Sequence, residues 1–141
     1  MQTFLPEPSF VLSAQMLDRQ RLGKQRVEAW QILRALLGVT KGWTTHPATL
    51  MWRGYEDALS LYAIAICEEW ISRGYKDTML PRFQAFLQNE SLAVMPPWLG
   101  RDDIHASHRS NLLRKDRGFY SRYGWSESDD LPYVWPLTRE G

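Results

Sequence analysis

The segment LDRQRLGKQRVEAW, residues 17–30, surrounds Glu28 with cationic side chains. Arg21, Lys24 and Glu28 are spaced three and four residues apart, so in a helix they share one face. Positive charge in excess of what one Glu can pair is typical of phosphate binding. A Glu among cations stays ionised, and it could stabilise positive charge on a sugar or move a proton. A solvated helix face with ordinary ion pairs is the alternative.

A second polar segment is HASHRSNLLRK, residues 105–115, in which His105, His108, Asn111 and Lys115 recur at helical spacing. Two His residues three apart can hold a metal, but the chain has one further His and no nearby Cys, so we predict no metal site. We interpret these side chains as hydrogen-bonding groups for phosphate or base edges. A capped amphipathic helix without a ligand is the alternative.

A third segment, GWTTHPATLMWRG, predicts a loop that leads into a helix. Pro47 suits the first helical position, and Thr45 or His46 would cap it. Polar residues at a helix N-terminus favour an anion site, although a plain cap explains them equally well. An unpaired base could stack on a Trp, but Trp residues in a small domain are more often core. The candidates are Trp43, Trp52 and Trp98.

Helical periodicity dominates the chain, and strand signals are nearly absent. We predict one helix from an N-cap at Ser13 to Leu37, a second that ends at Arg73, and a third over residues 102–116. Short helices and irregular aromatic segments near the C-terminus complete the domain. We therefore expect an all-α fold, with residues 1–141 as a single domain of three principal helices. Gly23 lies inside the first helix, where it would mark a close approach by another backbone.

The formal net charge is +1, but the charges are not evenly spread. Residues 17–34 and 101–122 are basic, whereas residues 55–70 are acidic, so one basic face could meet a polyanion. Cys67 is the one cysteine of the chain, which excludes an internal disulfide, and its apolar neighbours predict that it is buried. We find no signal peptide and no membrane span, and we expect a cytoplasmic monomer.

The order of the motifs resembles the pyrimidine-dimer DNA glycosylase family, the phage endonuclease V type and its bacterial relatives. The motifs run from LDRQRLGKQRVEA through GWTTHPATLMWRGYEDAL and EEWISRGYKDT to HASHRSNLLRK and FYSRYGW. The resemblance implies a compact all-α fold, double-stranded DNA with a damaged or modified base as substrate, no cofactor, and association with the nucleoid when bound. Family members cut the N-glycosidic bond of a damaged pyrimidine, and many then cleave the strand at the abasic site.

The resemblance also implies roles for particular residues. The α-amine of the N-terminus would attack C1′ of the deoxyribose, and Glu28 would stabilise the cationic sugar. DNA would be held by nearby cations and by the other polar segments. The residues so implied are Arg19, Arg21, Arg26, His46, His105, His108, Asn111, Arg114 and Lys115.

The chain departs from the phage enzyme at its second position, where a bulky Gln2 should leave Met1 in place. The attacking amine would then belong to Met1, and Lys24 is the alternative nucleophile. A binding module without catalysis remains an alternative function, as does a metal-dependent nuclease built on His46, His105 and His108.

Overall fold

The computed structural model describes residues 1–87 and 92–136, and within these ranges the chain is helical and contains no strand. Three helices are long, as the sequence predicts, which confirms the all-α class. The α-helices are α1 (Phe10–Met16), α2 (Arg19–Leu36), α3 (Pro47–Leu50), α4 (Glu56–Ser72), α5 (Leu80–Phe86), α6 (Asp102–Lys115) and α7 (Arg117–Tyr120). A short 3-10 helix, Ser121–Tyr123, follows α7.

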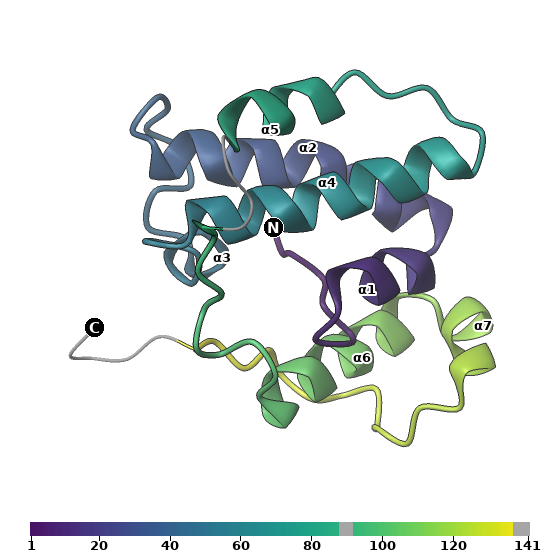
Figure 1. Cartoon of the computed structure of the whole chain (residues 1–141). Helices are drawn as coiled ribbons and strands as arrows, with labels where there is room; N and C mark the ends of the chain where they lie inside the picture. Colours follow the sequence, from purple (N-terminus) through teal and green to yellow (C-terminus); the bar gives the residue numbers. More distant parts are fainter. Residues whose placement is uncertain (88–91, 137–141) are drawn as a thin grey trace.

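The centre of the fold is the pair α2 and α4, with α5 packed against α4 on one side and α1 on the other (Figure 1). Helix α4 buries Leu59, Tyr62 and Ile66, which recur at three- and four-residue spacing as the sequence predicts. Cys67 is also fully buried, as expected. Among the described residues, no helix is both long enough and apolar enough to cross a bilayer.

The predicted single helix from Ser13 to Leu37 is wrong, because the chain breaks at Leu17 and Asp18. Both residues have extended backbone, and Asp18 caps α2 by accepting the N–H of Arg21. The phenol of Tyr120 donates to the Asp18 carboxylate and accepts its backbone N–H at 3.0 Å. An Asp at this position satisfies a free N–H at a helix start, so a new helix begins there. The preceding helix is capped by Ser9 rather than Ser13.

Gly23 does permit a close approach, but the neighbour is an indole ring and not another backbone. A Cβ at Gly23 would lie 3.0 Å from two ring atoms of Trp70 on α4. The missing side chain therefore lets Trp70 lie flush against α2. This contact forms part of the wall of the cleft described below.

The N-terminal segment lies between the α2–α4 pair and α6 (Figure 1), and it is hydrogen-bonded to all three helices. Gln2, Thr3, Phe4 and Leu5 are all buried. The closing segment, residues 124–136, is bound along α6. The N–H of Leu131 donates to the Ser110 hydroxyl, and that of Val134 donates to the Ser107 hydroxyl. The N-terminal and closing segments are thus both bound to α6.

Candidate active site

A cleft of about 660 Å³ opens beside the N-terminus, and a smaller pocket of about 240 Å³ adjoins it. Helix α2 forms the wall between them. Four residues line both hollows, namely Met1, Gln20, Lys24 and Glu28. The predicted nucleophile, the alternative nucleophile and the predicted carboxylate therefore share one site.

The N-terminal residue is held against Glu28 by its neighbour. The backbone N–H of Gln2 donates to Oε2 of Glu28 at 3.1 Å. Gln25, one turn before Glu28, receives the N–H of Phe4 at 3.1 Å and donates to the carbonyl of Gln2 at 2.8 Å. Gln25 is buried, and it is a site residue that sequence reasoning missed. A polar side chain on the apolar stripe of α2 was the signal that could have revealed it.

The pKa of His46 is affected by the α-amino group of Met1 and by the carboxylate of Glu28. Burial lowers its pKa, the positive α-amino group of Met1 lowers it further, and Glu28 opposes the shift. Its Nδ1 accepts the N–H of Ala48 at 3.0 Å, so of the two caps that the sequence allows for α3, Thr45 and His46, the cap is His46. The ring meets Trp43 edge-on at 5.4 Å and Trp135 at 6.1 Å. His46 is thus a neutral imidazole close enough to the Met1 amine for the amine to affect its pKa, and its Nδ1 is occupied by the helix cap.

The larger cleft has aromatic walls. Trp70 is fixed by the guanidinium of Arg26, 4.6 Å from its ring, and by Tyr75, which stacks on it at 4.3 Å. Trp43, in the loop before α3, also lines the cleft and is 49% exposed. Its φ is 66°, a conformation that costs energy for a bulky residue. Trp52 and Trp98 are buried in the core. Of the three Trp considered for stacking, Trp43 is the one that a base could reach.

A comparison with family models matches residues 1–82 to the model for pyrimidine dimer DNA glycosylase. The chain belongs to this family. A search of curated proteins and a search of solved structures found no match. The matched region includes Met1, Gln25, Glu28 and the aromatic walls of the larger cleft.

Beyond the match to the glycosylase family, two residues complete the smaller pocket. Lys115, at the end of α6, and Tyr133, in the closing segment, line it together with Arg21. Burial raises the pKa of Tyr133 to about 12, with Arg114 opposing and Glu28 adding to the rise. The phenol therefore keeps its proton at neutral pH. The sequence marks residues 130–136 only as an irregular aromatic segment near the C-terminus, and it does not single out Tyr133 as a site residue.

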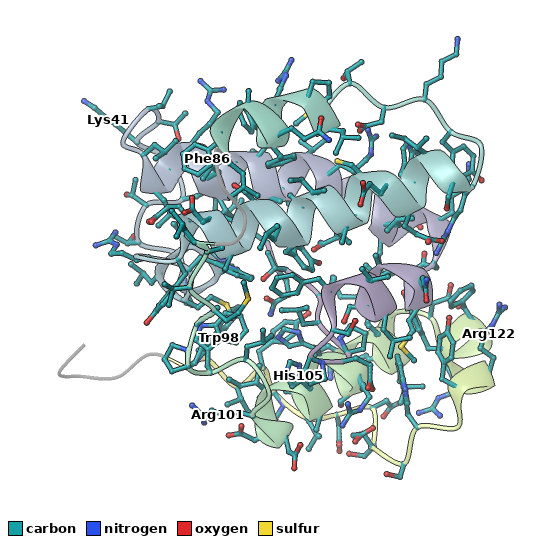
Figure 2. The ribbon with its side chains drawn as sticks, viewed as in Figure 1. Lys41, Phe86, Trp98, Arg101, His105 and Arg122 are labelled. Atoms are coloured by element: carbon teal, nitrogen blue, oxygen red, sulfur yellow. The ribbon has the colours of Figure 1, made fainter. Side chains whose placement is uncertain are left out.

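Three residues predicted to contact DNA are instead buried. His105 is 2% exposed, His108 is fully buried and Asn111 is 2% exposed. The two histidines bind the backbone of Leu5, and Asn111 donates to the carbonyl of Leu131 at 3.1 Å. A side chain that water cannot reach cannot reach a phosphate, so the prediction of DNA contacts at these three positions is wrong. Figure 2 shows His105 inside the molecule, whereas Arg101 and Arg122 point outward.

The predicted cations divide into two groups. Arg19 and Lys24 are exposed at the cleft, Lys115 is exposed at the smaller pocket, and Arg21 lines that pocket while pairing with Asp18 at 3.2 Å. Arg26 lines neither hollow and pairs with Asp77 at 2.6 Å, so its predicted role in holding phosphate is not supported. Arg114 is exposed, but its guanidinium donates to the carbonyl of Asp129 and to Asn111.

The residues that the structure describes contain no group of three or more His, Cys, Asp or Glu side chains that could hold a metal ion. His105 and His108 use ring nitrogens for Leu5, and His46 uses Nδ1 for its cap. The arrangement of the three histidines therefore gives no support to the metal-dependent nuclease.

Proposed function

We propose that this protein removes a damaged or modified pyrimidine base from double-stranded DNA and then cleaves the strand at the abasic site. The α-amine of Met1 is the nucleophile and Glu28 is the essential carboxylate. The observation that carries this proposal is the hydrogen bond from Gln2 N–H to Glu28 Oε2, 3.1 Å long, which brings the first residue and the carboxylate to one cleft. Membership of the glycosylase family supports the reaction class.

Met1 suits this role because α-amines as a class are neutral at pH 7 more often than the side chain of Lys. Lys24 lines both hollows and is exposed, so it is the competing nucleophile. The Met1 side chain packs against the core, and Gln2 behind it is buried. An amine anchored in this way loses little freedom when it reacts, which favours it over a flexible Lys.

The proposed reaction has four steps. The neutral amine attacks C1′, the bond from C1′ to the base breaks, and the base leaves with the electron pair and takes up a proton. The attached nitrogen then loses a proton, its lone pair forms the C=N bond of a Schiff base with C1′, and the C1′–O4′ bond breaks as O4′ takes up a proton. Loss of a proton from C2′ expels the 3′ phosphate, and water finally releases the unsaturated aldehyde and restores the amine.

Glu28 acts where positive charge develops. Departure of the base leaves oxocarbenium character on the sugar, and an adjacent carboxylate stabilises that charge. The carboxylate can also accept the proton that the attacking amine loses. The bond from Gln2 fixes Oε2, which leaves the second oxygen, Oε1, for these tasks.

The two hollows suit different parts of the nucleotide. The larger cleft, with Trp43, Val27 and Trp70, offers apolar surface to a base that has left the stack. The smaller pocket, with Arg21, Lys115 and the Tyr133 phenol, offers cations and a hydrogen-bond donor to a phosphate or sugar. Glu28 stands between them, where C1′ joins base and sugar.

Comparison of wild type with Glu28→Gln tests the proposal. The substrates are duplex oligonucleotides that carry a cyclobutane thymine dimer, an abasic site or no damage. Release of base from the dimer duplex should fall by a factor of about 100–1,000 in the variant, since one electrostatic contact is removed. DNA binding, followed by fluorescence anisotropy, should persist.

Lys76→Gln is the control, because Lys76 is exposed and lines neither hollow. Full activity of Glu28→Gln would exclude Glu28 from the mechanism. Binding without release of base from any duplex, by wild type as well, would favour the module without catalysis.

A further inference from the structure

The backbone of the N-terminal segment is hydrogen-bonded mainly to side chains. Gln25 serves Gln2 and Phe4, and the Tyr62 hydroxyl donates to the carbonyl of Phe4 at 2.9 Å. Leu5 is held at both of its polar groups, as described next. The side chains that make these hydrogen bonds all belong to helices, which fix their positions. The register of this segment is thus set by specific side chains.

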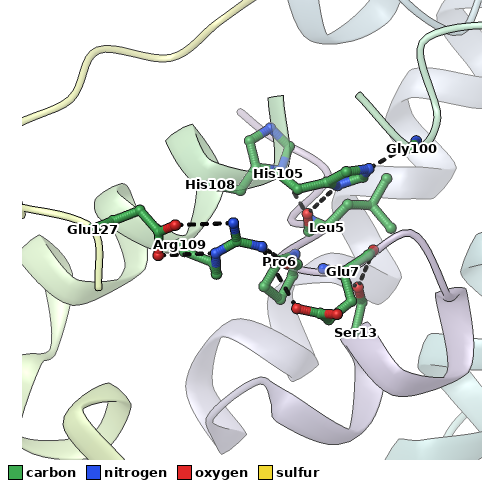
Figure 3. A network of polar contacts seen from close by, with 9 residues as sticks. All are labelled: Leu5, Pro6, Glu7, Ser13, Gly100, His105, His108, Arg109 and Glu127. Carbon is green, nitrogen blue, oxygen red and sulfur yellow. Dashed lines mark hydrogen bonds and ion pairs between the residues drawn. The ribbon is translucent and has the colours of Figure 1, made fainter. Parts of the chain in front are cut away.

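Two histidines on α6 are hydrogen-bonded to the backbone of Leu5 (Figure 3). The N–H of Leu5 donates to Nδ1 of His108 at 2.9 Å, and Nδ1 of His105 lies 2.7 Å from the carbonyl oxygen of Leu5. Nε2 of His105 accepts the N–H of Gly100 at 2.9 Å. The two rings lie one helical turn apart, so they take the donor and the acceptor of one residue.

These bonds require both imidazoles to be neutral. Nδ1 of His108 accepts a hydrogen bond, so it carries no proton, while His105 carries its proton on Nδ1 because Nε2 is an acceptor. Burial lowers the pKa of His108 to about 3, and it lowers the pKa of His105 as well. Protonation of His108 at Nδ1 would remove the acceptor.

The charged groups around the pair come from three elements. Arg109 on α6 opposes protonation of both rings, while Glu7 on the N-terminal segment and Asp102 on α6 favour it at His105. The Tyr133 ring of the closing segment meets His108 edge-on at 5.9 Å. Arg109 also donates to the carbonyl of Pro6 at 2.7 Å and is held by Glu127 at 2.9 Å (Figure 3).

We propose that His105 and His108 are positioning residues for the reaction. By holding Leu5, they place the amine of Met1, four residues earlier in the chain, against Glu28. The inference rests on the proposed function, in which that amine is the nucleophile. Successive Cα atoms are about 3.8 Å apart, so a slip of one residue would carry the amine out of reach of C1′. Misplacement of a reacting group by 1 Å can already cost a factor of about 100 in rate.

The test compares His108→Leu with His108→Asn. Leu removes the acceptor and keeps an apolar side chain, whereas the Oδ1 of Asn stands near the place of the imidazole Nδ1 and can accept the same N–H. Phe83→Leu is the control for general destabilisation, because Phe83 is fully buried on α5 and packs edge-on against Trp30.

Two readouts are measured at neutral pH. The first is the amide resonance and hydrogen exchange of Gln2 and Leu5 in the full-length protein. The second is the single-turnover rate of borohydride-trapped adduct at saturating abasic-site duplex, together with the Kd of that duplex. His108→Leu should speed exchange at both amides and lower the trapping rate at least ten-fold, with an unchanged Kd because the histidine does not contact DNA.

His108→Asn should restore both readouts in large part, and Phe83→Leu should leave the trapping rate of its folded fraction unchanged. An unchanged trapping rate in folded His108→Leu would overturn the inference, as would unchanged exchange at Gln2. Absence of a trapped adduct with wild type would instead refute the proposed amine chemistry, and the positioning role would fall with it. The two failures are therefore distinguishable.

Discussion

The peptide N–H of Gln2 and Oε2 of Glu28 are 3.1 Å apart, although 26 residues separate them in the chain. A chain terminus is ordinarily mobile, whereas this hydrogen bond ties the N-terminus to a carboxylate on a helix. Residues 2–5 are buried between α2, α4 and α6, so the helical core itself supports the terminus.

Removing a positive charge from either hollow should weaken DNA binding and make the Kd less dependent on salt concentration. Lys24→Ala and Lys115→Ala should each lower the magnitude of the slope of log Kd against log salt by about 0.9, the value for one phosphate contact in B-DNA. Arg122→Ala is the control, since Arg122 is exposed, points outward (Figure 2) and lines neither hollow. Equal slopes for wild type and both cleft variants would show that DNA binds elsewhere.

Gly23→Ala should destabilise the protein by about 1 kcal/mol. Ala in a helix interior gains about 1 kcal/mol over Gly, but overpacking against a held ring costs roughly 1–3 kcal/mol. Trp70 cannot easily yield, because Arg26 and Tyr75 hold it. Urea unfolding measures the change. In a Trp70→Leu background the same substitution should stabilise, and a stabilising effect in the wild-type background would contradict the packing argument.

Arg26→Met should cost on the order of 3 kcal/mol, because it leaves a buried carboxylate without its ion pair. The Asp77 side chain is fully buried. Burial alone raises the pKa of Asp77, but the hydrogen bonds from Arg26 and from the N–H groups of Leu80 and Met79 outweigh it and lower the pKa overall. Thermal unfolding checks the loss, and Asp77→Asn added to Arg26→Met should recover part of it.

The salt slope of DNA binding should stay unchanged in Arg26→Met. A reduced slope with normal stability would show instead that Arg26 holds a phosphate.

Stability should fall on acidification below about pH 6.5. His108 has a pKa of about 3 in the folded protein, against 6.5 for an ordinary His, so the unfolded chain binds more protons between these values. The contribution of the neutral imidazole is complete above about pH 6.5 and declines as pH falls toward 3, by up to roughly 1.4 kcal/mol per pH unit. Urea unfolding from pH 7.5 to 4.5 measures it.

His108→Asn is the matched variant for this titration, since it cannot take up a proton there. The free energy of unfolding of wild type should approach that of His108→Asn as pH falls. Parallel curves across the range would mean that His108 is not held neutral.

Much of the fold follows from the sequence, because α4 is marked by its local periodicity, and α6 by its helical spacing with acidic residues in its first turn and basic residues in its last. The break at Asp18 is different: its carboxylate is tied to the phenol of Tyr120, 102 residues away. The ion pair of Arg26 with Asp77 likewise spans 51 residues. Local spacing cannot reveal partners at such distances.

For the candidate site, the sequence is informative where the chemistry of a residue restricts its role: it singles out Glu28 among cations, and Glu28 lines both hollows. It is not informative on α6, where His105, His108 and Asn111 face inward. Polar side chains ordinarily mark a solvent face, but this helix packs against the backbone of the N-terminal and closing segments, whose N–H and C=O groups need partners. The polar face of α6 is therefore an interior face.

The most direct test of the central claim is to identify the residue that borohydride fixes to DNA. Wild-type protein would be trapped on an abasic-site duplex, digested, and mapped by mass spectrometry, with Lys24→Met run in parallel. We predict that the adduct lies on the α-amine of Met1 in both proteins and that Glu28→Gln forms it far more slowly. An adduct on Lys24, or none with wild type, would contradict the account.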